Sequence, residues 1–240
     1  METAKIFDFN GGGELKVVDG GKTVKLTKSG KVKRTPNNNK TDRIVMPIKN
    51  IEDIERCKEF LKNRTENAPE RYKKSYAKDL LLFKIAINIG LRVNDLLSIT
   101  WTDIFKPDTH QFNSYFVPKE QKTKKVRQIF INDAFKAAVK EYLKYVPDVK
   151  LEGYVFTNRQ GDRLSDASVD KLMKLLEKEL DIPNLSTHSL RKTFAYHMYM
   201  QTQDLSLVQE ILQHSSVAVT RRYLGISQEV KKKAYEELNL

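Results

Sequence analysis

The sequence predicts a mainly α-helical protein that carries a small three-stranded antiparallel sheet. Three observations lead to this class. Six segments after residue 46 place apolar residues at intervals of three and four, the period of a helix with one buried face. Three short apolar runs near the middle are bounded by turn-forming residues, as strands are. The first 45 residues are rich in glycine, asparagine and lysine, unlike the rest of the chain.

We therefore predict a basic arm over residues 1–45 and a main domain over residues 46–240. The arm contains ten Lys and Arg residues against five Asp and Glu residues. Within it, residues 14–18 and 23–26 are expected to form two short strands around the Gly20-Gly21 turn. Because an isolated hairpin is marginally stable, two interpretations stay open: a flexible basic tail, or an arm that becomes ordered on DNA.

The main domain is expected to be mostly helical, with its strands in the middle. No repeat of 20–50 residues is visible, so we expect one domain. The predicted helices are Ile51–Leu61, Lys74–Ile89, Ala134–Tyr145, Ser168–Leu180, Ser189–Met200 and Leu205–Leu212. The predicted strands are Ile104–Lys106, Ser114–Pro118 and Val126–Ile131.

Charge and composition restrict the kinds of partner. The 240 residues carry a formal net charge of +12, which favours a polyanion such as nucleic acid or an anionic membrane surface. Forty per cent apolar residues exclude a wholly disordered polycation. Cys57, the one cysteine, cannot form an internal disulfide and is expected to be a small core residue.

Cofactor and membrane signals are missing from the sequence. It contains no Cys/His cluster of zinc-ligand spacing and no phosphate-binding loop, so we expect no cofactor and no metal. The first residues do not resemble a signal peptide, and no run approaches the roughly 20 apolar residues of a membrane span. We expect a soluble, cytoplasmic protein without membrane contact.

A tight turn after the second predicted helix presents the first candidate. Gly90 fits a helix end with positive φ, and Asn94 or Asp95 fits the start of the next helix. Arg92 then lies between two buried helices. From this segment alone it is either a salt-bridge partner of Asp95 or a ligand for an oxyanion or phosphate.

Two later segments present the other candidates. Thr187 is the expected N-cap of a helix whose first turn places His188 and Arg191 on one face, at the amide-rich end that favours anions. His197 lies on the packed face and is expected to be structural. Further on, a helix break brings His214 before a short segment, capped by Ser216, that contains a tyrosine, Tyr223. Two arginines, two histidines, a lysine-rich turn and a tyrosine together are what phosphoryl transfer to a phenol requires.

These motifs resemble those of the tyrosine recombinase/integrase family. The matching segments are Gly90-Leu-Arg-Val-Asn-Asp, His188-Ser-Leu-Arg191 and Leu212-Gln-His214-Ser-Ser, with Tyr223 nine residues after His214. The resemblance covers residues 47–240 and implies that family's catalytic-domain fold. It implies catalytic roles for Arg92, His188, Arg191 and His214, and makes Tyr223 the nucleophile. It also places a lysine in the turn between the last two strands, where Lys122 fits best and Lys124 is next. Asp95 is then expected to orient active-site groups or to cap a helix.

The resemblance implies site-specific DNA recombination through a 3′-phosphotyrosyl intermediate, for a phage or another mobile element. Double-stranded DNA is the implied substrate, and neither ATP nor a metal is needed. The tail at residues 227–238 is expected to form a helix that docks onto a neighbouring subunit of a tetramer, or packs on its own domain. The alternatives are an enzyme like topoisomerase IB and a non-catalytic DNA-binding regulator that retains the fold.

Two features depart from the family pattern. Gln213 stands where glycine usually precedes the second histidine, so the turn is expected to form without the positive-φ freedom of glycine. Only the 45-residue arm precedes the catalytic domain, where typical members carry a separate helical domain. A complete C-shaped clamp around DNA is therefore not expected, and the small fimbrial phase-switch recombinases are the nearest precedent.

Overall fold

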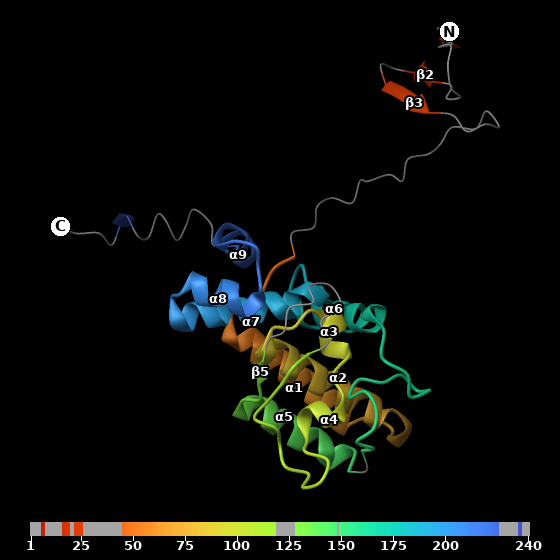
Figure 1. Cartoon of the computed structure of the whole chain (residues 1–240). Coiled ribbons are helices and arrows are strands. Elements are labelled where there is room, and N and C mark those ends of the chain that lie inside the picture. The colour runs from red at the N-terminus through yellow and green to blue at the C-terminus, as the bar shows by residue number, and fades with distance from the viewer. Residues whose placement is uncertain are drawn as a thin grey trace. The chain divides into compact units, whose positions relative to one another are not determined.

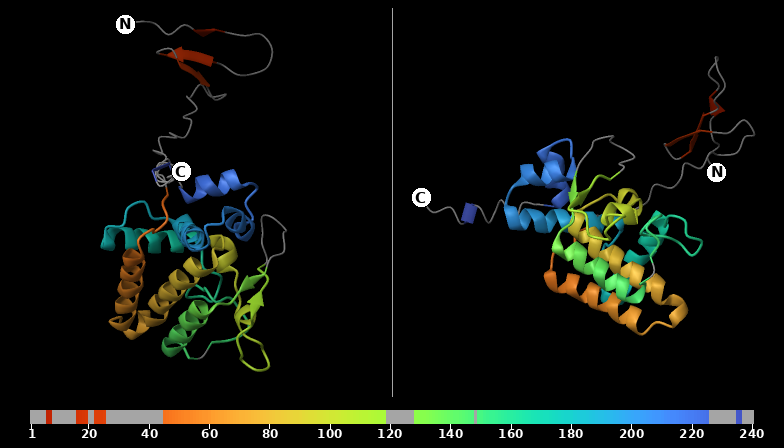
Figure 2. Two further views of the ribbon diagram at one scale, coloured as in Figure 1. Left: turned by 90° about the vertical axis from the view of Figure 1, so that its left-hand side faces the viewer. Right: turned by 60° about the horizontal axis from the view of Figure 1, so that its bottom comes forward.

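The computed structural model describes residues 45–118, 128–147, 149–225 and 235–236, together with the backbone of three short strands near the N-terminus. The chain divides into two compact units, Met1–Ile44 and Val45–Leu240, shown in Figures 1 and 2. In the first unit, strands β1 (Ile6–Phe7), β2 (Lys16–Asp19) and β3 (Lys22–Lys25) pair antiparallel in that order. Val17 pairs with Val24, within the two segments where short strands are expected, and β1 lies outside those segments.

Helix α2 (Glu70–Ile89) is the centre of the second unit. Leu80, Leu81, Leu82 and Phe83 are all buried, so this stretch contacts other elements on every side, as a central helix must. It packs against α1 (Ile51–Glu66), α5 (Asp133–Tyr145) and α7 (Thr187–Thr202). In Figure 1, α7 crosses one end of the group formed by α1, α2 and α5.

The mainly helical fold with a small antiparallel sheet is confirmed, but among the described residues of the second unit this sheet has two strands instead of three. Strands β4 (Tyr115–Phe116) and β5 (Ile129–Phe130) pair antiparallel. The expected first strand is reduced to a single bridge between Phe105 and Phe112. Thr100 and Asp103 form a capping box that starts helix α4 (Trp101–Ile104), and this short helix occupies the start of the predicted strand.

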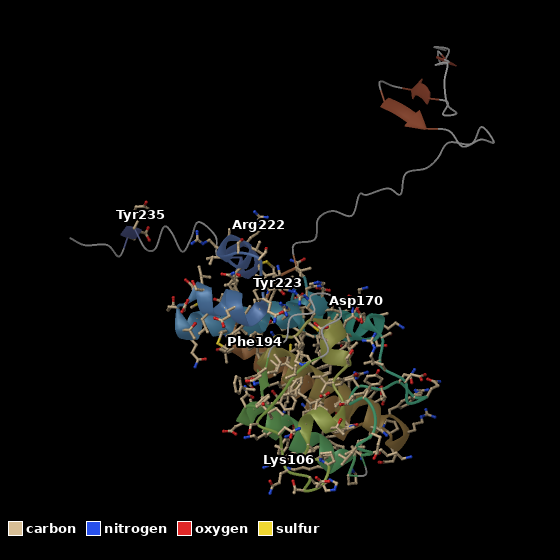
Figure 3. All side chains as sticks on the ribbon, in the orientation of Figure 1. Lys106, Asp170, Phe194, Arg222, Tyr223 and Tyr235 are labelled. Atoms are coloured by element: carbon tan, nitrogen blue, oxygen red, sulfur yellow. The ribbon has the colours of Figure 1, made fainter. Side chains whose placement is uncertain are left out.

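The last three described helices form a smaller core of their own. Helix α8 (Leu205–Leu212) and helix α9 (Val217–Leu224) pack with α7. Figure 3 labels Phe194 on α7 and Tyr223 on α9 within this group. The buried side chains of this cluster are Phe194, Ala195, Val208, Leu212 and Leu224. The cluster determines where α9, and with it Tyr223, lies against α7.

The predicted helices are all present and begin or end within a few residues of the expected positions. The short helix α3 (Val93–Leu97) and the longer helix α6 (Asp166–Leu180) border the region that contains Arg92. Cys57 is fully buried, as expected, and burial raises the pKa of its thiol to about 12. The predicted C-terminal helix falls outside the described residues except for positions 235–236. None of the described helices is long and apolar enough to span a bilayer.

Candidate active site

The turn between α2 and α3 directs Arg92 into a pocket. Gly90 has a φ of 61°, the predicted left-handed conformation, and its N–H donates to the carbonyl of Ala86. A Cβ atom at this position would lie 2.1 Å from Cδ1 of Phe194, so both backbone and packing require glycine. Helix α3 begins at Val93 with Arg92 as its N-cap.

The expectation that Asn94 or Asp95 caps α3 is wrong. The carbonyl of Arg92 already accepts the N–H of Leu96, so the helix starts two residues earlier than a preference for Asn and Asp caps suggests. Asp95 is 5% exposed and lines the same pocket as Arg92. It is therefore not the N-cap of α3, but it lies in the first turn of this helix and belongs to the surroundings of the arginine.

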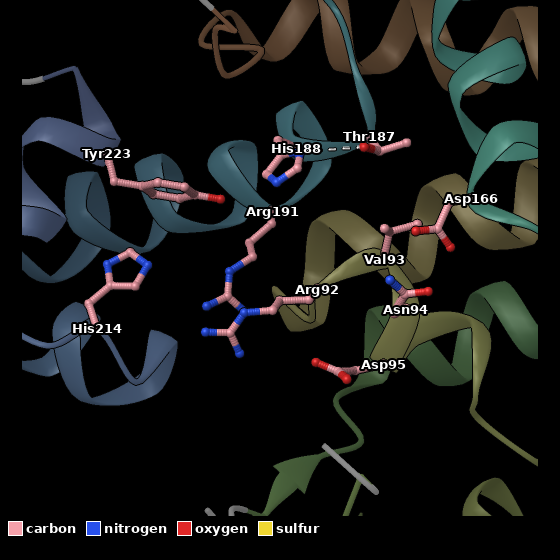
Figure 4. A pocket seen from close by; sticks show the side chains of 10 residues that line it. All are labelled: Arg92, Val93, Asn94, Asp95, Asp166, Thr187, His188, Arg191, His214 and Tyr223. Atoms are coloured by element: carbon pink, nitrogen blue, oxygen red, sulfur yellow. Dashed lines mark hydrogen bonds between the residues drawn. The ribbon is translucent and has the colours of Figure 1, made fainter. Parts of the chain in front are cut away.

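Helix α7 contributes His188 and Arg191 from its first turns. Its N-cap is Ser186, one residue before the predicted Thr187: the Ser186 hydroxyl accepts the N–H of His188, and the Ser189 hydroxyl accepts the N–H of Ser186. His188 is exposed and Arg191 is 5% exposed, yet both line the pocket (Figure 4). This arrangement confirms that the two side chains share a face.

Arg191 joins three helices through its guanidinium group. Nη1 donates to the carbonyl of Gly90 over 2.8 Å, and Nη2 donates to the carbonyl of Leu212 over 2.6 Å. These carbonyls lie at the C-terminal ends of α2 and α8, where backbone acceptors have no partner inside the helix. Two charge-assisted bonds therefore fix the position of a buried positive charge.

Gln213 forms the turn that leads to His214, and its conformation contradicts the expectation. Its φ of 51° is left-handed although it is not glycine. The N–H of Gln213 donates to the carbonyl of Glu210, and the N–H of His214 donates to that of Gln209. This pair of bonds is the Schellman motif, which compensates the strain of a side chain in this region.

Replacing Gln213 with glycine should therefore stabilise the protein. Relief of the left-handed strain outweighs the greater freedom that glycine gives the unfolded chain, and we expect the free energy of unfolding to rise by about 0.5–1 kcal/mol. Urea denaturation at neutral pH measures the change. Gln213→Ala is the matched control and should not stabilise. A loss of stability in Gln213→Gly would show that the glutamine side chain contributes more than its backbone costs.

His214 and Tyr223 are neighbours across the α8–α9 turn. Their rings are 4.8 Å apart between centroids, at an interplanar angle of 74°. Nδ1 of His214 lies 3.0 Å from the hydroxyl oxygen of Thr220. The Nζ atom of Lys192 lies 5.2 Å from the centroid of the Tyr223 ring. In Figure 4 the tyrosine hydroxyl points into the pocket, toward the side occupied by Arg191.

The phenolic oxygen of Tyr223 is buried and makes no hydrogen bond within the described residues. Burial raises the pKa of Tyr223 above its usual value, and the charge and polar contact of the Arg191 side chain, together with the charge of Arg92, act in the opposite direction. Burial also lowers the pKa of His214 to about 4, helped by the same two arginines. At neutral pH the resting pocket therefore contains a protonated phenol and a neutral imidazole.

The depressed pKa of His214 predicts a specific loss of stability in acid. Between pH 6.5 and pH 4 the unfolded chain binds a proton at this histidine that the folded protein does not, so stability falls as the pH falls through this range. Because the ring is only partly buried, solvent screening leaves a contribution of about 1 kcal/mol. Denaturant melts at pH 7 and pH 5 should show a smaller acid loss for His214→Asn than for the unaltered protein. Equal losses would contradict this origin.

Five of the six predicted site residues line one pocket with a volume of about 400 Å³. Its full lining is Arg92, Val93, Asn94, Asp95, Asp166, Thr187, His188, Arg191, His214 and Tyr223 (Figure 4). The sixth predicted residue, Lys122, falls outside the described residues. Within the described ranges no three His, Cys, Asp or Glu side chains are grouped to hold a metal ion. Two guanidinium groups and two imidazoles around one tyrosine suit a phosphate diester.

Sequence reasoning missed two residues beside this pocket. Lys192 follows Arg191, and its Nζ atom donates to the carbonyl of Val45 as well as lying over the Tyr223 ring. Thr220 is fully buried and lies one helical turn before Tyr223. The spacing of three residues places Thr220 on the same side of α9 as Tyr223, but this spacing alone does not mark a functional residue. His197 lies outside the pocket, with Nε2 3.0 Å from the carbonyl oxygen of Ile48, in keeping with its expected structural role.

Comparisons with known proteins agree with this arrangement. Residues 52–229 match the model of the phage integrase family. The chain is 32% identical over 194 residues to Probable integrase/recombinase YoeC of Bacillus subtilis, covering 80% of this chain and 96% of YoeC. It is 26% identical over 167 residues to tyrosine recombinase XerC of Thermodesulfovibrio yellowstonii, covering 66% of this chain and 54% of that protein. This chain thus matches about half the length of XerC.

A solved structure gives the same fold. The structure of the XerH site-specific recombinase bound to palindromic difH substrate superposes with a TM-score of 0.62 at 22% identity, covering 88% of this chain and 61% of XerH. The family match spans most of the sequence and includes every described residue that lines the pocket. The chain therefore belongs to the phage integrase family of tyrosine recombinase enzymes.

Proposed function

We propose that this protein is a site-specific DNA recombinase that cleaves and rejoins double-stranded DNA through Tyr223. The phenolic oxygen attacks the phosphorus of a scissile phosphodiester, the bond from phosphorus to the 5′ oxygen breaks, and a 3′-phosphotyrosyl link forms. A 5′-hydroxyl from a partner strand then attacks the same phosphorus and releases the tyrosine. Because the covalent link keeps the phosphodiester energy, rejoining needs no separate energy source.

The observation that carries this proposal is the pocket into which the Tyr223 hydroxyl points. Arg92, Arg191 and His214 line it with the tyrosine, so a phosphate seated there meets two fixed positive charges and an imidazole. Negative charge grows on the nonbridging oxygens as the nucleophile attacks, and donors that are already in position stabilise it. The buried bonds of Arg191 to two backbone carbonyls hold its guanidinium without help from the substrate.

Proton movement is assigned to His188 and Lys122. Since burial raises the pKa of Tyr223, the attacking phenol must lose its proton during the reaction, and His188 is the acceptor or the group that orients it. A lysine from the segment between β4 and β5 in the sequence protonates the leaving 5′ oxygen, and Lys122 is our choice for that role. Arg92 and Arg191 perform the charge neutralisation that a metal ion supplies in many nucleases.

The wider biological role follows the family. We propose that the protein integrates, excises or inverts a mobile element, that it assembles on DNA as a tetramer through its C-terminal tail, and that it acts in the cytoplasm. XerH was solved bound to its difH DNA, and its fold covers most of this chain. The DNA that flanks the gene is the first place to search for the recombination site.

Covalent trapping tests the reaction directly. A nicked suicide duplex taken from the flanking DNA should become covalently joined to the protein in the presence of EDTA. Digestion of the trapped product should leave a peptide containing Tyr223 on the 3′ phosphate and a free 5′-hydroxyl. Sequence-specific binding without any adduct would contradict the proposal and indicate a DNA-binding regulator. Relaxation of supercoiled DNA without strand exchange would indicate a topoisomerase.

A further inference from the structure

The two nitrogens of the His214 ring have different surroundings. Nδ1 lies 3.0 Å from the Thr220 hydroxyl oxygen, on the side of α9. In Figure 4 the other nitrogen points toward the guanidinium groups of Arg92 and Arg191. A neutral imidazole carries one proton, so the nitrogen that faces the pocket is either a donor or an acceptor. The hydrogen bond that Nδ1 makes determines which nitrogen carries the proton, and so whether Nε2 donates or accepts.

Thr220 has one hydroxyl proton and two acceptors within reach. Its oxygen lies 3.4 Å from the carbonyl of Ser216, one helical turn earlier, and 3.0 Å from Nδ1 of His214. If the proton goes to Ser216, Nδ1 must carry its own proton and Nε2 presents a lone pair to the pocket. If the proton goes to Nδ1, Nε2 carries the ring proton and is a donor. The shorter of the two contacts is the one to the histidine.

A phosphate in the pocket discriminates between these two forms. Its nonbridging oxygens are acceptors only, so a lone pair on Nε2 would repel them, whereas an Nε2 proton would bind them. Before a phosphate binds, His214 is neutral at neutral pH because burial and the two arginines lower its pKa, so the ring carries a single proton whose position the Nδ1 contact can determine. The useful form is therefore the one in which Nδ1 accepts.

We propose that Thr220 is a positioning residue for His214: its hydroxyl donates to Nδ1 and so makes Nε2 a hydrogen-bond donor to a phosphate oxygen in the pocket. This inference rests on the proposed function, which places the scissile phosphate there. Thr220 and Tyr223 lie on the same helix, so the helix that presents the nucleophile also prepares the histidine. His214 acts as a donor only while α9 is docked against α8.

The matched variants are Thr220→Val and Thr220→Ser. Valine keeps the branched shape in this fully buried position and removes the hydroxyl, whereas serine keeps the hydroxyl. On the nicked duplex that traps the unaltered protein, we expect cleavage to slow about 10- to 100-fold in Thr220→Val and to recover in Thr220→Ser, by analogy with the loss of a group that orients a metal-binding histidine. Thermal melting and DNA affinity are measured for each variant to show that it is folded.

A double-mutant cycle separates positioning from general packing. In a His214→Ala background the ring is absent, so Thr220→Val should slow cleavage no further. A purely structural role for the hydroxyl, such as its bond to the Ser216 carbonyl, would slow cleavage equally in both backgrounds. Equal effects would overturn the proposal, and so would unchanged cleavage in Thr220→Val alone.

Nitrogen NMR of histidine-labelled protein tests the proton position without relying on activity. With saturating inorganic phosphate as the probe, the unaltered protein should show His214 protonated at Nε2, and Thr220→Val should lose that preference. A ring protonated at Nδ1 in the unaltered protein with phosphate bound would overturn the proposal. If no DNA adduct forms at all, the proposed function fails, while the NMR result still decides the role of Thr220.

Discussion

Replacing Tyr223 with phenylalanine should abolish covalent trapping of DNA while leaving DNA binding intact. The change removes one oxygen, the proposed nucleophile, so we expect the rate of adduct formation to fall by at least about 10,000-fold, the scale seen when a covalent nucleophile is removed. The measurement is gel detection of the protein–DNA adduct on a labelled nicked duplex. Fluorescence anisotropy with the same duplex measures the binding that should persist.

The same substitution should have little effect on the stability of the protein. The Tyr223 hydroxyl is buried, has no hydrogen bond of standard geometry among the described residues, and has the Arg191 side chain as a polar neighbour, so its removal should change the free energy of unfolding by less than about 1 kcal/mol. Lost activity combined with nearly unchanged stability is the result expected of a group retained for chemistry. An adduct that persists in Tyr223→Phe would assign the nucleophile to another residue.

Tyr196→Phe is the matched control. Tyr196 packs against the same small cluster of α7, α8 and α9 but does not line the pocket. Its variant should trap DNA at the rate of the unaltered protein. If both variants lose trapping, the effect comes from disturbed packing of the cluster and not from the loss of a nucleophile.

The helices could be predicted because each buries one face, and burial leaves a period of three to four in the sequence. Their exact ends could not, because caps depend on competition between neighbouring residues. Ser186 and Thr187 are both good caps, and the reciprocal bond with Ser189 decides for Ser186. The prediction of the first strand was wrong for a similar reason. The capping box of Thr100 and Asp103 starts a helix at the place where the apolar pattern suggested a strand.

The site could be predicted as a set of residues but not as a set of contacts. The motif spacing identified Arg92, His188, Arg191, His214 and Tyr223, and all five line one pocket. Nothing in the spacing shows what their side chains contact, since that depends on how α2, α7, α8 and α9 pack.

Gln213 illustrates a further gap. Because residue 213 is a glutamine and not a glycine, a left-handed turn was not expected there. The paired hydrogen bonds at the end of α8 nevertheless make that conformation favourable overall. The contact between His214 and Thr220 could not be predicted either. A threonine in a helix is common in any sequence, and only the structure shows that its hydroxyl lies beside a histidine nitrogen.

Arg191 should show two separable losses when it is replaced. Arg191→Met leaves the buried carbonyls of Gly90 and Leu212 without their charged donor, so we expect the free energy of unfolding to fall by about 2–4 kcal/mol. It also removes a positive charge from the proposed transition state, which should slow cleavage about 1,000-fold. Urea denaturation and single-turnover trapping, at a temperature where the variant is folded, measure the two losses independently.

Arg191→Lys distinguishes charge from geometry. A single ammonium group restores the charge but lacks the planar fork that reaches two carbonyls on different helices, so stability should recover only in part and cleavage should remain slow. Arg222→Met removes an exposed cation from α9 and should change stability by less than about 0.5 kcal/mol. If Arg191→Met is as stable as Arg222→Met, the two carbonyl bonds do not hold the helices together. Full cleavage by Arg191→Lys would mean that positive charge alone, without the fixed fork, is sufficient at the scissile phosphate.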